Sequence, residues 1–189
     1  MTLANLIAAV SAAIALFVFC NPIRQYKSSE RWKRAEFVAT QIKEFNEDKM
    51  NRAILLMMDY HPIRIELYPD QQTPEKRFVN VNLETLVKAI RDEAGLTEDE
   101  FQMKIYFKHF LQSLQRLNYF IDANAIHPKE PQADLYYPIG LMSGDGWEDK
   151  YKLTGIDMRP FSEAVKSFLA RWGYGWVQEF MVRIRTGRR

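Results

Sequence analysis

The uncharged run Leu3–Ile23 constrains what this chain can fold into more than any other feature. Its 21 residues include no Asp, Glu, Lys or Arg, and ten of them are Leu, Ile, Val or Phe. At about 1.5 Å of rise per residue, a helix of this length covers roughly 30 Å, the hydrocarbon thickness of a bilayer. The run therefore predicts a transmembrane anchor over residues 1–23.

A cleaved signal peptide is the main alternative for this segment. Such a peptide has a basic start, a short apolar run and small residues directly before the cleavage site. Here the first charged side chain is Arg24, and the small-residue stretch Ala13–Ala15 lies in the middle of the apolar run. These departures favour a helix that is retained in the mature protein.

A basic segment over residues 24–34 follows the apolar run directly. It carries five cations and one acid, Glu30. By the positive-inside rule, the residues after the span are expected in the cytoplasm and the short N-terminus outside, as in a single-pass protein of the inner membrane. A solvated helix face is the alternative to lipid contact. The residues predicted to touch lipid are Arg24, Tyr26, Lys27, Arg31, Trp32, Lys33 and Arg34.

Small residues recur along one face of the predicted span. Spacings of three and four residues between small side chains let two membrane helices approach closely, so the face predicts packing between spans and a possible homo-oligomer. Alanine is common in spans, which leaves a plain anchor as the alternative. The residues of this face are Ala4, Ala8, Ser11, Ala12 and Ala15.

The net charge of +2 hides an uneven distribution along the chain. The basic segment carries +4 and the arginines after Val182 carry another +4, which leaves −6 for residues 35–182. A surface that binds nucleic acid would be basic over the body of the protein as well, so no nucleic-acid partner is expected. The single cysteine, Cys20, excludes an internal disulfide and a multi-thiolate zinc site.

Residues 35–189 predict a helical cytoplasmic domain. Apolar residues recur at helical spacing, and Thr97 with Glu100 has the pattern of a capping box at the start of the clearest helix. Alternating residues at 63–68 and 77–81 predict one small β-hairpin. The fold class expected is mainly α, a transmembrane helix followed by a domain resembling a helical bundle. The seam of its clearest helix consists of Met103, Phe107, Phe110, Leu114, Leu117 and Ile121.

A stretch rich in proline and glycine, residues 127–160, predicts a long irregular connection. Long ordered loops often carry function, although others only wrap the core. Aromatic side chains dominate the energetics of interfaces, so the aromatic residues of this stretch are the predicted anchors for a protein partner. They are Tyr136, Tyr137 and Trp147.

Side chains capable of catalysis are scattered. The three histidines His61, His109 and His127 have no partner at the spacing of a metal site, and no phosphate-binding or nucleophile motif occurs. No catalytic residue, metal or cofactor is predicted from the sequence. Catalytic groups can still converge from distant positions without leaving a motif.

The run RQYKSSERWKRAEFVATQIKEF, residues 24–45, resembles the entry helix of an uncharacterised bacterial family of single-span membrane proteins with a helical cytoplasmic domain. The likeness extends loosely to residues 51–59 and 110–126. The family has no known activity, so the resemblance implies a membrane-anchored helical protein and no catalytic residue.

The function expected from these features is that of a membrane-anchored adaptor or regulatory protein that binds a partner. Two alternatives stay open. The span could oligomerise and perturb the membrane, or the domain could be an enzyme acting on a substrate near the membrane. The discriminating feature for the enzyme would be a convergent polar pocket.

Overall fold

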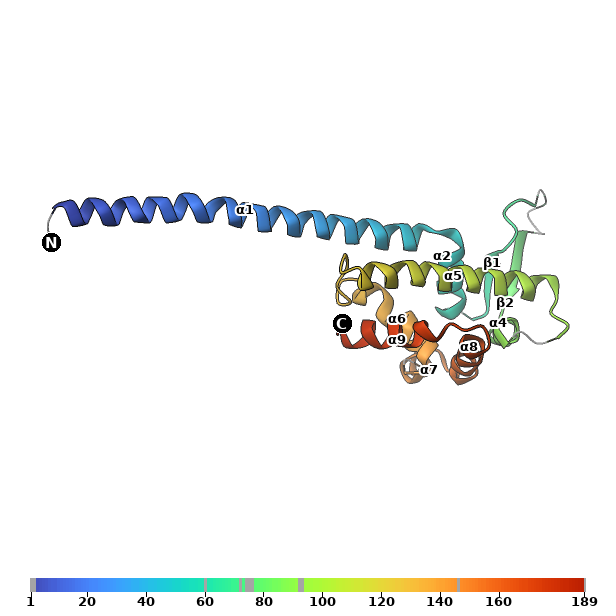
Figure 1. Ribbon diagram of the computed structural model, residues 1–189. Helices are drawn as coiled ribbons and strands as arrows, with labels where there is room; N and C mark the ends of the chain where they lie inside the picture. The colour runs from blue at the N-terminus through green and yellow to red at the C-terminus, as the bar shows by residue number, and fades with distance from the viewer. Residues whose placement is uncertain are drawn as a thin grey trace. The chain divides into compact units, whose positions relative to one another are not determined.

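The computed structural model describes residues 3–188 except 60, 72, 74–76, 92–93 and 146, and it describes no side chain at 3–16, 19 or 147. The chain divides into two compact units, Met1–Thr40 and Gln41–Arg189. Helix α1 (Leu3–Glu47) begins in the first unit and ends in the second (Figure 1). The predicted boundaries after residues 23 and 34 stay a prediction.

The described part of the chain contains no helix long and apolar enough to cross a membrane. The prediction of a transmembrane helix is therefore wrong. The predicted location in the inner membrane, with the N-terminus outside and the domain in the cytoplasm, is wrong for the same reason. The side chains of the predicted small-residue face, Ala4, Ala8, Ser11, Ala12 and Ala15, lie outside those that the structure describes.

The second unit is mainly helical, as the sequence predicts. The strands β1 (Ile63–Glu66) and β2 (Phe78–Val81) form a two-stranded sheet. The helices described in this unit are α2 (Lys49–Asp59), α4 (Leu83–Arg91), α5 (Glu98–Asp122), α6 (Gln132–Ser143), α7 (Trp147–Thr154), α8 (Arg159–Arg171) and α9 (Gly175–Thr186). The predicted hairpin is confirmed: β1 and β2 pair antiparallel, with Ile63 opposite Val81 and Ile65 opposite Val79.

Helix α5 is the longest element that lies wholly in the second unit, and α2, α4 and α9 contact it (Figure 1). The capping box at its start is confirmed, since the Thr97 hydroxyl accepts a hydrogen bond from the Glu100 amide and the Glu100 carboxylate accepts one from the Thr97 amide. Every residue of the predicted seam is buried: Met103, Phe107, Phe110, Leu114, Leu117 and Ile121.

Aromatic rings join several of these helices through the core. The Phe110 ring centroid lies 5.6 Å from that of Phe45 and 6.5 Å from that of Phe107. Phe107 in turn meets Phe168 of α8 edge to face at 5.4 Å. Ring pairs in offset or edge-to-face arrangements add to the free energy gained from burial alone. The rings therefore hold the end of α1, α5 and α8 in one core.

The stretch 127–160 is not a long irregular loop, because α6 and α7 lie within it. Pro131 is the N-cap residue of α6, where a missing N–H has little cost, and Pro138 is buried inside the helix. Gly144 has a φ of 92° and ends α6 in the left-handed conformation that glycine adopts readily. The prolines and glycines therefore mark helix ends as well as irregular chain.

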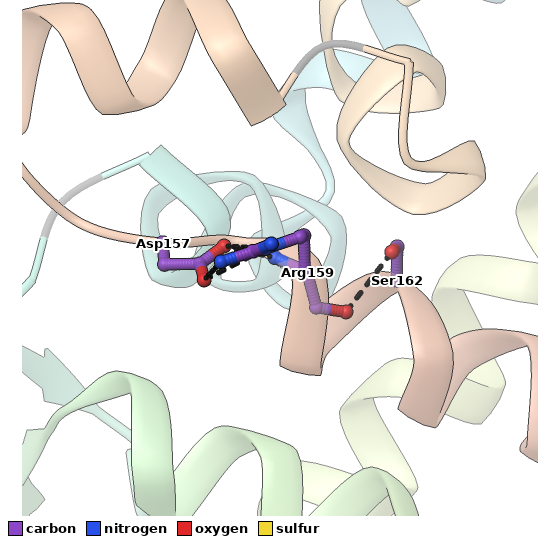
Figure 2. Close-up of polar contacts among 3 residues, drawn as sticks. All are labelled: Asp157, Arg159 and Ser162. Carbon is purple, nitrogen blue, oxygen red and sulfur yellow. Dashed lines mark hydrogen bonds and ion pairs between the residues drawn. The ribbon is translucent and has the colours of Figure 1, made fainter.

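An ion pair fixes the entry to α8. Figure 2 shows the Arg159 side chain folded back on Asp157, with its Nε 2.8 Å and its Nη2 2.6 Å from Asp157 Oδ2. Hydrogen bonds from Arg159 lower the pKa of the Asp157 carboxyl. One turn further on, the Ser162 hydroxyl donates to the Arg159 carbonyl over 3.0 Å. The two charges neutralise each other locally, so this pair orders the chain and is not a candidate site.

Candidate functional site

A groove between α2 and β1 combines an apolar floor with basic side chains at its rim, and we name it the α2–β1 groove. Its volume is about 330 Å³. Pockets for small ligands or for a few side chains of a partner usually begin near this size. Nine residues line it: Lys49, Arg52, Ala53, Leu56, Arg64, Ile65, Glu66, Pro69 and Tyr106.

Helical spacing explains the contribution of α2. Positions 52 and 53 each lie three or four residues from both 49 and 56, so the four positions lie on one side of the helix. Lys49 and Arg52 are exposed, whereas Ala53 is buried. The same face of α2 therefore supplies both a basic rim and an apolar floor.

The hairpin supplies the opposite side of the groove. Ile65 is buried and adds to the floor, while Arg64 and Glu66 are exposed on β1. The guanidinium carbon of Arg64 lies 5.3 Å from the ring centroid of Phe78 on the neighbouring strand. This cation–π contact holds the arginine side chain over the hairpin while its N–H groups can still bind an acceptor.

Tyr106 of α5 is a buried residue that also lines the groove. Its hydroxyl donates a hydrogen bond to the Leu67 carbonyl over 3.1 Å. Burial raises the pKa of Tyr106, so the hydroxyl keeps its proton and remains a donor at neutral pH. The phenol therefore fixes the chain just after β1 and is not itself a reactive group.

The groove has an excess of positive charge. Its lining includes three cations, Lys49, Arg52 and Arg64, and one acid, Glu66. Among the described residues, no carboxylate pairs with any of the three cations, whereas Glu66 lies 4.0 Å from Arg77. Cations at a rim that no carboxylate of the described chain neutralises attract negatively charged groups from outside.

The predicted partner anchors lie elsewhere in the second unit. Tyr136 and Tyr137 are exposed on α6, and the side chain of Trp147 lies outside the part that the structure describes. The Arg185 guanidinium carbon lies 5.1 Å from the Tyr136 ring centroid, and the Lys150 ammonium 6.0 Å from that of Tyr137. The structure does not bring these residues into the groove, and partner binding by them stays a prediction.

The predicted lipid-contact residues lie on α1. Arg24, Tyr26, Lys27, Arg31, Trp32 and Lys33 are exposed and Arg34 is half-buried. Lys33 lies 3.9 Å from Glu30, a contact between exposed side chains one helical turn apart. Contact of these residues with lipid is not tested by their exposure and stays a prediction.

The histidines occupy different surroundings. His109 lies 3.1 Å from the Asp48 carboxylate, His61 lies half-buried near Lys150, and the His127 ring accepts a hydrogen bond from the Lys129 amide. Within the described ranges, no group of three or more His, Cys, Asp or Glu side chains could hold a metal ion.

Sequence reasoning missed the α2–β1 groove. The basic and apolar positions 49, 52, 53 and 56 were a readable signal, because a lysine and an arginine flank a small apolar face at helical spacing. The missing information was the position of β1, which contacts α2 in the folded domain.

Comparison of the chain with protein-family models, with curated proteins and with solved structures finds no match. The resemblance of residues 24–45 to a bacterial family of single-span proteins therefore stays a prediction. The site itself has to support any statement about function.

Proposed function

We propose that the protein is a partner-binding module whose α2–β1 groove takes an acidic segment of another protein. The observation that supports this proposal is the set of three cations, Lys49, Arg52 and Arg64, around an apolar floor. The occupant that fits has one or two carboxylates for the rim and an apolar side chain for the floor. This keeps the binding role expected from the sequence and assigns it to a different surface.

Two properties favour an acidic peptide over a nucleic acid as the occupant. The floor consists mainly of aliphatic side chains, while single-stranded nucleic acids are usually held by aromatic rings that stack on bases. Residues 35–182 carry a net charge of −6, which disfavours a long polyanion more than a short acidic segment.

Electrostatic attraction at an exposed rim mainly accelerates association and is screened by salt. The aliphatic floor then supplies the part of the affinity that depends little on salt. Binding to the groove should therefore weaken at high ionic strength without vanishing.

The test measures fluorescence anisotropy of a labelled peptide of alternating glutamate and leucine with the full chain. The expected result is saturable binding, at least tenfold weaker after the double substitution Arg52→Glu and Arg64→Glu. Lys166→Glu is the matched control, because Lys166 is exposed on α8 and does not line the groove. A lysine–leucine peptide should bind far more weakly.

Two results would contradict the proposal. One is equal binding of the acidic peptide to the wild type and to the double variant. The other is tighter binding of a single-stranded oligonucleotide than of the acidic peptide, which would identify a nucleic-acid surface instead.

A further inference from the structure

Helix α7 exposes an apolar side chain next to its acidic residues. Leu153 is 81 % exposed, the largest exposed fraction among the large hydrophobic residues that the structure describes. Asp149 lies four positions earlier, so its carboxylate and the Leu153 side chain lie on the same side of the helix. Glu148 is exposed in the first turn as well. The exposed surface of α7 therefore combines carboxylates with an aliphatic side chain.

The inner side of α7 attaches the helix to its own domain. Lys150 is buried there, and its ammonium lies 2.9 Å from Asp59 at the C-terminal end of α2. The α2–β1 groove is lined by earlier positions of α2, between 49 and 56, and Figure 1 shows α7 apart from the hairpin that forms its other side. Because α7 is held outside the groove of its own chain, it can enter only the groove of a second copy.

The carboxylates of α7 are available to a partner. In the part of the chain that the structure describes, no lysine, arginine or histidine forms an ion pair with Glu148 or Asp149. The acidic first turn of α5 differs, because Asp99 and Glu100 already accept hydrogen bonds from other side chains. Of these two acidic turns, the one in α7 therefore has the carboxylates that can meet a basic rim.

The charges of α7 and of the α2–β1 groove are complementary. The groove is lined by three cations and one acid, Glu66, whereas α7 exposes two carboxylates and one cation, Lys152. The apolar floor of the groove also offers a place for the Leu153 side chain, which is exposed in the single chain. Helices often bind partners in this way, with apolar side chains in a groove and charges that fix the pairing around it.

We propose that the α2–β1 groove of one copy binds helix α7 of a second copy of this chain. Leu153 then lies on the apolar floor, and Glu148 and Asp149 meet the basic rim. This inference rests on the proposed function, for which it names the partner. Each copy carries one groove and one α7, so a twofold dimer makes the contact twice. Burial of Leu153 stabilises the dimer, and the charges select this pairing over others.

The test uses the full chain with its leucines replaced by photo-leucine, a diazirine analogue close to leucine in size. After illumination, dimers are separated on a denaturing gel and their crosslinks are identified by mass spectrometry. The expected crosslink joins position 153 of one copy to residues 49–56 or 64–69 of the other. Arg52→Glu with Arg64→Glu, the groove double variant, should lower its yield about tenfold. Lys166→Glu is the matched control and should leave the yield unchanged, because Lys166 is exposed outside the groove.

An exchange of charges separates loss of this contact from loss of folding. Glu148→Lys with Asp149→Lys, the α7 double variant, should also crosslink poorly to itself, because lysines then face a basic rim. In a mixture, α7 of this variant meets the acidic rim of the groove double variant, and opposite charges face each other again. The crosslink between the two variants should therefore recover, which unfolded chains could not achieve.

Three results would overturn the inference: no crosslink between position 153 and the groove, an equal yield in the groove double variant, or no recovery in the mixture. The glutamate–leucine peptide distinguishes such a failure from failure of the proposed function. Binding of the peptide without the crosslink would overturn this inference and leave the proposed function standing. Absence of both would overturn both.

Discussion

The Lys150 ammonium lies 2.9 Å from the Asp59 carboxylate, which joins α7 to the end of α2 across 91 positions of sequence. The Lys150 side chain is 2 % exposed, whereas that of Asp59 is 39 % exposed. Taking a charge out of water is costly unless it is paired and hydrogen-bonded. Asp59 therefore allows a charged lysine to lie inside the domain, and the partly exposed carboxylate bears less of the desolvation cost.

Removal of Asp59 should destabilise the protein more than removal of the lysine charge. Asp59→Ala leaves the buried ammonium without this acceptor, so we expect a loss of about 1.5–3 kcal/mol in the free energy of unfolding. Lys150→Met keeps most of the apolar stem and removes the charge, so its cost should be smaller. Urea denaturation measures both. In the Lys150→Met background, Asp59→Ala should cost little, and an undiminished cost would show that the pair is not coupled.

Acid should destabilise the domain through His61. Burial of the ring, and then the nearby Lys150 ammonium, lower the pKa of His61 from 6.5 to about 4, and the Asp59 carboxylate opposes this shift. The unfolded chain binds a proton near the ordinary pKa, so between about pH 6.5 and pH 4 it holds more protons than the folded chain. The stability contributed by neutral His61 is therefore full above this window and is lost as the pH falls through it.

The measurement for this effect is Tm as a function of pH for the wild type and for His61→Asn. Asparagine does not titrate, so the variant should lose less Tm than the wild type between about pH 7 and pH 5. His127→Asn is the control, because it replaces a histidine elsewhere in the domain. Parallel pH profiles for the wild type and His61→Asn would show that His61 does not take up the proton on unfolding.

Phe110→Ala should remove a large part of the stability of the domain. The residue is 1 % exposed and contacts the rings of Phe45 and Phe107. Truncation of a buried phenylalanine leaves a cavity and costs about 3–5 kcal/mol. Phe101→Ala on the same helix is the control, since Phe101 is 52 % exposed and should cost far less. Equal midpoints of urea denaturation for the two variants would contradict the assigned face.

Thr97→Ala should cost about 1 kcal/mol, because it removes the side-chain acceptor that caps α5. Thr97→Ser keeps a hydroxyl at the same position and should be nearly neutral. Thermal unfolding of the two variants separates the lost cap from the lost methyl group. A serine variant as unstable as the alanine variant would mean that the hydroxyl does not contribute.

Local patterns were sufficient to predict most elements of the second unit. The capping box of α5 depends on residues three positions apart, and the alternation of β1 is visible within four residues. Helix boundaries that depend on tertiary contacts are harder to predict from the sequence. The junction of the first two helices is an example: α1 continues to Glu47, α2 begins at Lys49, and Asp48 between them accepts a hydrogen bond from the Asn51 amide and lies 3.1 Å from His109 of α5.

The candidate site was less predictable than the fold. Lys49 and Arg52 are visible as cations on one helix face, but the sequence does not show that Arg64 lies across from them. The wrong prediction of a long irregular connection at residues 127–160 also has a physical cause. Proline and glycine were interpreted as signs of a loop, whereas Pro131 and Gly144 occupy the two ends of α6, where helices accept them.

The ring of Phe168 lies 5.4 Å from that of Phe107, 6.2 Å from that of Trp172 and 6.1 Å from that of Tyr174. Natural selection therefore cannot act on these four positions independently. A smaller side chain at 168 would leave a void that only a larger neighbour can fill, and a larger one would displace a ring. Among descendants of a common ancestor, substitutions at 107, 168, 172 and 174 should therefore be correlated, each compensating for the volume lost or gained at the others.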